Sequence, residues 1–291
     1  MKITNLFTRS SSLSLIAAIA LMASCQDEDK RLTASDTQDI SEETVTDSYY
    51  QDMDDMGSVA IATPSEAQLS TGRVEGSVTI TIDDSRFSCA TVTLERDAAS
   101  TADVPKGTIT VDFGTGCTDS RGNIRSGKLI FAYYKRRFQP GSTVVETTDN
   151  YYVNGIKLEG TRTSTNVTGS TEDAPKFNVV LTDGKATFPD GDVATRSSNI
   201  TWSWEKGATR LQDQLIIDKS SVANGTTRGG RTYAVSLQED LVYTRTCFMA
   251  VDGIKKYVID GTKEIIIDYG VGDCKNVTVT VNGITRQVSV K

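Results

Sequence analysis

The side chains that could do chemistry in this chain are carboxylates, lysines, tyrosines and hydroxyls, because its 291 residues contain no histidine. Without imidazole there is no Ser-His-Asp or Cys-His catalysis, no His-ligated zinc or haem, and no imidazole proton shuttle. A glycosidase needs only two carboxylates, about 5–10 Å apart across a cleft, but a sequence cannot show that separation. We therefore expect no catalytic residue and no enzyme, with a carboxylate-dependent glycan hydrolase as the alternative.

We also expect no metal ion and no other cofactor. The acidic pairs Asp83-Asp84 and Asp190-Gly191-Asp192 could hold Ca²⁺, but they are typical of hairpin turns. The formal net charge of −7 argues against a general nucleic-acid binder, which would usually be basic.

One stretch is rich in positive charge and has no acid between its first and last base. Aromatic residues are interleaved with the bases, so the segment could bind acidic polysaccharide, lipid phosphates or nucleic acid, although no sequence-specific nucleic-acid motif is present. The alternative, which we favour, is a strand with aromatics on its inner face and bases on its outer face. The six bases are Arg121, Arg125, Lys128, Lys135, Arg136 and Arg137.

Trp202 and Trp204 are two residues apart, so both point to the same face of a predicted strand. Exposed, they would form an aromatic platform on which sugar rings stack. Buried, they would belong to the core, which is the interpretation we favour because Thr201 and Ser203 would then form the polar face.

The cysteines accompany a short internal repeat. Ile109–Cys117 parallels Ile265–Cys274, since each combines a strand, an Asp, an aromatic residue, a Gly-x-Gly turn and a cysteine. Glycine in such loops usually serves backbone geometry, so we expect a turn rather than a Ca²⁺ loop. Three pairings of four cysteines are conceivable, and the matched spacing favours Cys89–Cys117 and Cys247–Cys274.

Residues 1–24 are typical of a secretory signal peptide, because Lys2 and Arg9 precede an apolar run of about ten residues. Cys25 follows Ala-Ser directly, so the segment resembles a bacterial lipoprotein signal, in which the peptide is cut before the cysteine and the cysteine is acylated. The acidic residues 26–30 resemble the surface-export signal of Bacteroidota lipoproteins; the alternative is a solvated acidic tether.

Residues 26–57 contain eleven acids and two bases, which favours a solvated, largely extended linker. Within the expected tether, 25–72, Val45, Tyr49, Met53 and Met56 recur at helical spacing. We predict a short helix near 41–56 that is capped by Asp39 or Ser41 and rests on the body or on a partner.

From residue 73 to 291 the pattern alternates with period two, and Asn-Gly and Asp-Gly turns separate the runs. We predict an all-β fold, an antiparallel sandwich or an extended meander. The internal duplication suggests two related units, about 73–170 and 171–291.

A set of motifs across 85–291 also resembles an uncharacterised family of Bacteroidota outer-membrane and surface lipoproteins with repeated Gly-x-Gly-Cys β units. The resemblance implies a location and an all-β fold, and no activity. Its motifs are Gly107-Thr108-Ile109, Asp112-Phe113-Gly114-Thr115-Gly116-Cys117, Arg125-Ser126-Gly127-Lys128, Tyr151-Tyr152-Val153-Asn154-Gly155, Gly160-Thr161-Arg162 and Tyr269-Gly270-Val271-Gly272-Asp273-Cys274.

The sequence therefore predicts a lipid-anchored protein of the outer membrane, exposed at the cell surface, with the periplasmic face as the alternative. Its expected role is non-catalytic binding or scaffolding, with glycan binding through the tryptophans or the basic segment as a further alternative. Its expected partners are the membrane, through the anchor, and glycans or envelope proteins, with no nucleic acid.

Overall fold

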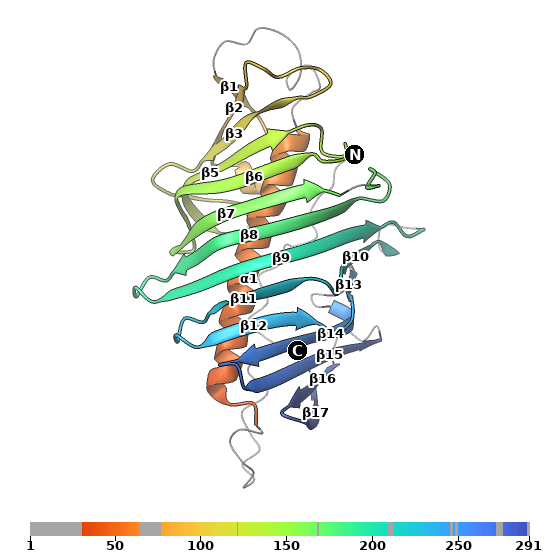
Figure 1. Ribbon diagram of the computed structural model, residues 1–291. Coiled ribbons are helices and arrows are strands. Elements are labelled where there is room, and N and C mark those ends of the chain that lie inside the picture. Colours follow the sequence, from red (N-terminus) through yellow and green to blue (C-terminus); the bar gives the residue numbers. More distant parts are fainter. Residues whose placement is uncertain are drawn as a thin grey trace. The chain divides into compact units, whose positions relative to one another are not determined.

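Over its described residues the protein is an antiparallel β structure with one α-helix that precedes the strands (Figure 1), as the sequence predicted. Strands account for 54% of the described residues. The structure, a computed structural model, describes residues 31–63, 77–120, 122–167, 169–208, 212–244, 247, 250–271 and 276–289.

The chain divides into two compact units. Among the described residues, unit 1 comprises 48–63, 77–172 and 177–193, and unit 2 comprises 31–47, 173–176 and the residues from 194 onward. The division falls inside the helix, so its first part belongs to unit 2 and its last part to unit 1.

Unit 1 is a meander in which neighbours pair antiparallel in the order β1, β2, β3, β5, β6, β7, β8, with β4 added beside β5. A short 3-10 helix, η3 (Ser85–Phe87), follows β1. The strands are β1 (Ser77–Ile80), β2 (Thr91–Arg96), β3 (Lys106–Asp112), β4 (Cys117–Thr118), β5 (Ile124–Tyr134), β6 (Thr143–Val153), β7 (Ile156–Asn166) and β8 (Lys176–Thr187).

Unit 2 is also antiparallel. Two short strands, β10 and β11, pair with successive parts of β9; in the same way β13 and β12 pair with successive parts of β14, and β15 to β17 follow in sequence order. The strands are β9 (Val193–Glu205), β10 (Gln214–Ile217), β11 (Val222–Thr226), β12 (Thr232–Leu237), β13 (Leu241–Thr244), β14 (Ala250–Ile259), β15 (Lys263–Val271), β16 (Asn276–Val281) and β17 (Ile284–Ser289).

Helix α1 (Ala34–Ala62) covers the predicted helix near 41–56 and extends beyond both of its ends. Thr33, rather than Asp39 or Ser41, caps it: the Thr33 hydroxyl accepts from the Asp36 N–H at 3.2 Å, and the Asp36 carboxylate accepts from the Thr33 N–H at 2.8 Å. This reciprocal capping box satisfies two backbone donors at the start of the helix. The expected extended linker is therefore absent from residues 34–57.

The inner face of α1 differs from the predicted apolar stripe. Val45 and Tyr49 are only half-buried, while Met53 and Met56 are buried as expected. The buried positions recur every three or four residues, polar in the first part of the helix and mainly apolar in the second: Asp36, Thr37, Asp39, Glu43, Thr46, Tyr50, Met53, Met56, Gly57, Ala60 and Ile61.

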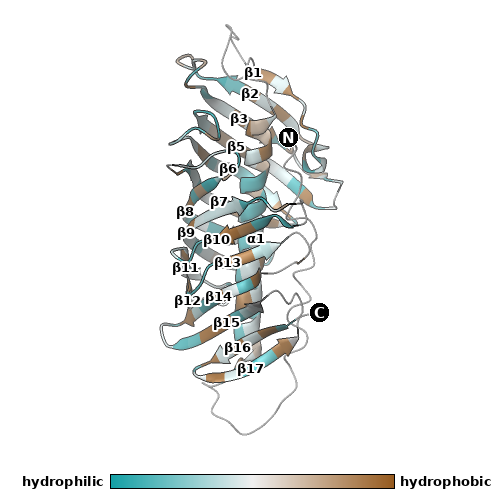
Figure 2. Cartoon of the chain, turned by 90° about the vertical axis from the view of Figure 1, so that its right-hand side faces the viewer, coloured by the Kyte–Doolittle hydropathy of each residue, from teal (hydrophilic) through white to brown (hydrophobic). Residues whose placement is uncertain are grey.

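Each unit builds a core on the strand face that meets its part of α1. In unit 1, Ile109, Leu129, Phe131 and Leu158 are fully buried, and burying such a side chain contributes about 1.5–3 kcal/mol. Gly57 lets the helix approach closely, because a Cβ there would lie 2.6 Å from a Phe131 ring carbon. Inward and outward residues alternate, so the strands in Figure 2 carry mixed teal and brown rather than continuous brown.

The repeated Asp-aromatic-Gly sequence forms the same turn in both units, as predicted. The Asp112 carboxylate accepts from the Gly114 N–H at 2.8 Å, and Asp268 accepts from Gly270 at the same distance. Both glycines have positive φ, which glycine adopts without strain.

We expect Gly127→Ala to destabilise unit 1 strongly. Gly127 sits at the bulge of β5 with φ of +76°, and an added Cβ would lie 1.9 Å from the carbonyl oxygen of Asn150. The backbone hydrogen bonds between β5 and β6 would have to break locally, at a cost of about 3 kcal/mol or more. Gly122→Ala is the matched control, since Gly122 also has positive φ but nothing within 4 Å; it should cost about 1 kcal/mol. Equal shifts in urea unfolding midpoint would contradict this account.

Candidate functional site

All eight acidic residues of α1 form ion pairs with bases carried by the strands and by the segments that connect them. The acids are Asp36, Asp39, Glu42, Glu43, Asp47, Asp52, Asp54 and Asp55. Their partners are Arg86, Arg125, Arg162, Arg196, Arg228, Arg231, Lys255 and Lys263. The pairs separate into one cluster for each unit.

In unit 2, Asp36 has two roles. It caps α1, and it also accepts from Arg231 at 2.9 Å and from Lys263. Arg231 further donates from Nε to Asp39 at 2.6 Å. Burial alone would raise the pKa of Asp36, but the hydrogen bonds from Lys263, Thr33 and Arg231 hold that pKa below its usual value.

Glu43 is a second buried acid of the unit 2 cluster. It pairs with Arg196, accepts from the Tyr257 hydroxyl at 3.0 Å, and lies 3.7 Å from Lys255 Nζ. Arg196, itself 4% exposed, also holds Asp47 at 2.8 Å. Burial would raise the pKa of Glu43, yet the charges of Lys255 and Arg196 outweigh burial and lower it.

The unit 1 cluster is a network around two buried arginines. Arg86 holds Asp52 at 3.1 Å, Asp55 at 2.8 Å and Asp84 at 2.9 Å. Arg125 holds Asp52 at 2.7 Å and Asp119 at 3.0 Å, and it donates to the Tyr151 hydroxyl at 2.6 Å. Because Asp52 bridges both arginines, the network fixes α1 to β5 and to the segment around η3.

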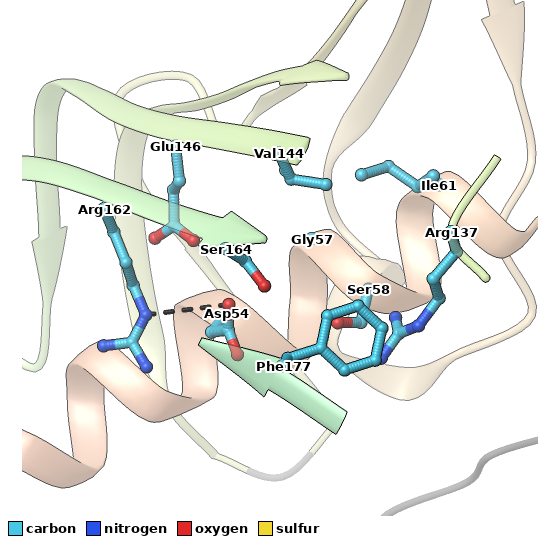
Figure 3. Close-up of a pocket in the computed structure, with 10 residues that line it drawn as sticks. All are labelled: Asp54, Gly57, Ser58, Ile61, Arg137, Val144, Glu146, Arg162, Ser164 and Phe177. Carbon is cyan, nitrogen blue, oxygen red and sulfur yellow. Dashed lines mark ion pairs between the residues drawn. The ribbon is translucent and has the colours of Figure 1, made fainter. Parts of the chain in front are cut away.

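A cavity of about 20 Å³ lies beside α1 in unit 1 (Figure 3). Glu146 on β6 and Arg162 on β7 line one end of it, with Asp54 of α1 3.6 Å from Arg162 Nε. Arg137 lines the other end, next to the ring of Phe177. The remaining lining residues are Gly57, Ser58, Ile61, Val144 and Ser164.

Three polar atoms of this cavity have no hydrogen-bond partner: Glu146 Oε1, Arg162 Nε and Arg137 Nε. Glu146 is 3% exposed and Arg162 6% exposed. Burial raises the pKa of Glu146 well above its usual value; Arg162 opposes this shift, and Asp54 and Asp52 reinforce it. Burial thus favours the neutral form of Glu146, which lies next to the ion pair of Arg162 and Asp54.

Two carboxyl groups and one raised pKa are the components that a glycosidase would need. The cavity, however, has room for about one water molecule and no sugar ring. The arrangement can therefore bind a small polar species, but it cannot place a glycosidic bond across Asp54 and Glu146. No group of three or more metal-ligating side chains occurs in the described part of the chain.

The structure separates the six bases of the predicted basic segment. Arg125 is buried and Arg137 lines the cavity, which contradicts a single outward row of bases. Lys128 is partly exposed and pairs with Asp112, while Arg136 donates to the Ala102 carbonyl. Lys135 lies over the Tyr134 ring, and Arg121 is outside the described residues.

Trp202 and Trp204 lie on β9 opposite Ile217 and Leu215 of β10, and both are half-buried. They thus belong neither to the fully buried core nor to a fully exposed platform.

The Cys89–Cys117 disulfide is present, with 6.0 Å between Cα atoms, as the spacing predicted. Cys247 is disulfide-bonded as well. Cys274 and Cys25 lie outside the described residues, so pairing of 247 with 274 and acylation of Cys25 stay predictions.

Comparison with protein-family models, curated proteins and solved structures yields no match. Among the described helices, none has the length and apolar character needed to cross a membrane.

Sequence reasoning missed Glu146, Arg162 and Arg196. Each stands at an inward position of an alternating strand, where an apolar residue is the usual occupant. A charge at an inward position, together with an acidic segment elsewhere in the chain, is the signal that could have found them.

We expect Arg196→Gln to lower the free energy of unfolding of unit 2 by about 3–5 kcal/mol, because it leaves Glu43 buried with reduced compensation. Arg228→Gln is the control: Arg228 is 28% exposed and 3.7 Å from Glu42, so its loss should cost about 0–1 kcal/mol. Urea unfolding at pH 7 measures both, and a small effect at Arg196 would contradict a buried pair.

We expect Glu146→Gln to stabilise unit 1 increasingly as the pH rises. The raised pKa means that the folded state keeps a proton that the unfolded chain releases above about pH 4.3. The wild type therefore loses stability relative to the variant above that pH, by up to about 1.4 kcal/mol per pH unit, until Glu146 ionises in the folded state.

Urea unfolding between pH 4 and pH 8 measures the difference. Glu95→Gln, at an exposed position of β2, is the control and should show no such trend. A difference that stays constant with pH would mean that Glu146 is ionised in the folded protein.

Proposed function

We propose that the chain is a lipid-anchored protein of the outer membrane, exposed at the cell surface, with a non-catalytic binding or scaffolding role. The observation that carries this proposal is the start of α1 at Ala34, only nine residues after Cys25, in a helix whose acids are fixed to the strands.

The position of α1 changes how far the body would stand from a lipid at Cys25. An extended tether over 25–72 would reach about 160 Å, at roughly 3.4 Å per residue. Nine residues span at most about 30 Å. The start of α1 is therefore held close to the lipid, which favours partners that are themselves part of the envelope.

The ion pairs of α1 also change the charge that the protein offers to its partners. After residue 57 the chain has 27 bases and 27 acids. Eight of those bases pair with α1. These bases are already neutralised by the helix, so they offer no charge to acidic polysaccharides or anionic lipid headgroups, which supports contact with envelope proteins or neutral glycans.

Cys25→Ala tests the anchor. We expect the variant to leave the membrane fraction and to appear in soluble fractions, because the substitution removes the residue that would carry the acyl chains. Ser24→Ala, which keeps the cysteine and a small residue before it, should remain in the membrane fraction. Membrane retention of Cys25→Ala would contradict lipid anchoring.

Protease treatment of intact cells then distinguishes the two faces of the outer membrane. A surface protein loses its β body under these conditions, whereas full protection would place the body on the periplasmic side.

A further inference from the structure

The face of the unit 1 sheet that points away from α1 is rich in threonine. Inward and outward side chains alternate along each strand, so the residues that flank the buried Ile109, Leu129 and Phe131 point outward. Figure 1 views unit 1 from this side, with its strands in front of α1. The outward threonines include Thr93, Thr108, Thr110, Thr147, Thr161 and Thr163.

The strand register places these threonines side by side. Thr79, Thr93 and Thr110 are successive partners on β1, β2 and β3. Thr143 of β6 faces Thr165 of β7 in the same way. Side chains directly opposite each other have Cβ atoms about 4.5–5.5 Å apart. The face is therefore an ordered array in which each threonine presents one hydroxyl and one methyl group.

The hydroxyls of this array are available to a ligand. Within the described part of the chain, the threonines named above form no side-chain hydrogen bond through their hydroxyls. The outward threonines of unit 2 differ, because Thr195 pairs with Thr226 and Thr280 with Thr285, each at 2.8 Å. The hydroxyls of unit 2 thus satisfy one another, whereas those of unit 1 are left to the solvent.

The centre of this face carries no charge, because small aliphatic residues fill the positions between the threonines. Outward charges lie toward its margins, on Glu95 of β2 and on Lys128 near the start of β5. A charged ligand would lose water over the centre without gaining a counter-charge, which favours a neutral ligand. The aliphatic residues are Ile130, Ala132, Val145 and Val180.

Two exposed tyrosines lie on the same face, toward opposite ends of β5 and β6. Tyr134 is 42% exposed at the end of β5, and Tyr152 is 37% exposed opposite Ser126. From Ser126 to Tyr134 the strand spans about 26 Å, at roughly 3.3 Å per residue. A tyrosine ring offers an apolar surface on which a sugar ring can stack and a hydroxyl that can bond it. An extended chain of several sugar rings would reach from one tyrosine to the other.

The composition of the face favours a sugar over a protein partner. Threonine and valine are under-represented among the residues that dominate binding between proteins, and the outward side chains named above include no tryptophan or arginine. A pyranose ring has C–H groups on its faces and hydroxyls around its rim, which match the methyl and hydroxyl groups of the threonines.

We propose that the outward face of the unit 1 sheet binds a neutral, extended polysaccharide, which runs along β5 and β6 between Tyr134 and Tyr152. The threonine hydroxyls form hydrogen bonds with its hydroxyl groups, and the aliphatic residues contact the faces of its rings. This assignment rests on the proposed binding role and names both the class of ligand and the surface that holds it.

Calorimetric titration of the full chain in a sugar-free detergent tests the site. Cellohexaose and mannohexaose are the extended neutral probes, maltohexaose is neutral but coiled, and hexagalacturonate is extended but acidic. We expect saturable binding of an extended neutral probe, about tenfold tighter than binding of maltohexaose or hexagalacturonate. Absence of binding by both extended neutral probes, or equal affinity for the acidic one, would overturn the proposal.

Variants then locate the site. Thr110→Val combined with Thr163→Val removes two hydroxyls and keeps β-branched side chains that suit strands, so it should weaken binding about tenfold. Tyr134→Ala, at an exposed position, should weaken binding to a similar extent. Thr280→Val is the matched control in unit 2, because its hydroxyl already pairs with Thr285, and it should bind as the wild type does. Unchanged affinity in the double variant or in Tyr134→Ala would contradict the assignment.

Hydroxyl-radical footprinting of the wild type covers the case in which a variant fails to fold. The bound probe should slow oxidation of Tyr134 and Tyr152 several-fold and leave Tyr49 of α1 unaffected. No protection of the two tyrosines would count against the site. Protection that grows with protein concentration in the absence of any probe would also count against it, because a second copy of the chain would then cover the face.

Binding is measured with purified protein and does not depend on where the protein resides. Failure to bind would overturn this site and leave the lipid anchor standing. Membrane retention of Cys25→Ala would overturn the anchor and leave a measured affinity standing.

Discussion

The neutralisation of one acidic helix by bases on the strands is the interaction on which the rest of this structure depends. The part of α1 from Asp36 to Thr46 turns mainly polar side chains toward unit 2, so the hydrophobic effect alone does not hold it there. Removing such acids from water is unfavourable unless each meets a base of good geometry. The positions of Arg196, Lys255 and Lys263 on their strands, and of Arg231 directly before β12, are therefore constraints on the fold and not only on its surface charge.

The two units hold their parts of α1 by different interactions. In unit 2 the helix is held by charge, with Glu43 among Arg196, Lys255 and Tyr257. In unit 1, apolar residues such as Met53 and Met56 carry much of the burial, and the charges gather into a network around Arg86 and Arg125. Both units leave buried polar atoms without hydrogen-bond partners beside the helix, at Glu146, Arg162 and Arg137 in unit 1 and at Glu42, Arg196 and Arg231 in unit 2.

Much of the fold follows from the sequence, because strand alternation, Asn-Gly and Asp-Gly turns and the repeated Asp-aromatic-Gly motif act over short distances. The Cys89–Cys117 bond was predictable from its spacing for the same reason. The role of the acidic segment was not predictable. In the sequence, a helix whose inner face is rich in aspartate cannot be distinguished from a solvated helix unless the bases that pair with it are known. Those bases lie far along the chain. Arg125 and Arg137 look like one surface stripe in the sequence, although the strand alternation and the bend after β5 direct them to different environments.

The sequence separation of the pairs around Asp36 has a consequence for how the protein is made. Arg231 is 195 residues and Lys263 is 227 residues from Asp36. α1 is synthesised before every described strand. Arg231 lies directly before β12, and Lys263 is the first residue of β15. The first turn of α1 therefore cannot form these ion pairs until most of the chain has been synthesised. Contacts of such long range form late, because the intervening chain must first be ordered. The first of the described elements to be synthesised is thus among the last to be completed, because the acids of its first turn meet Arg231 and Lys263 only after most of the strands have been made.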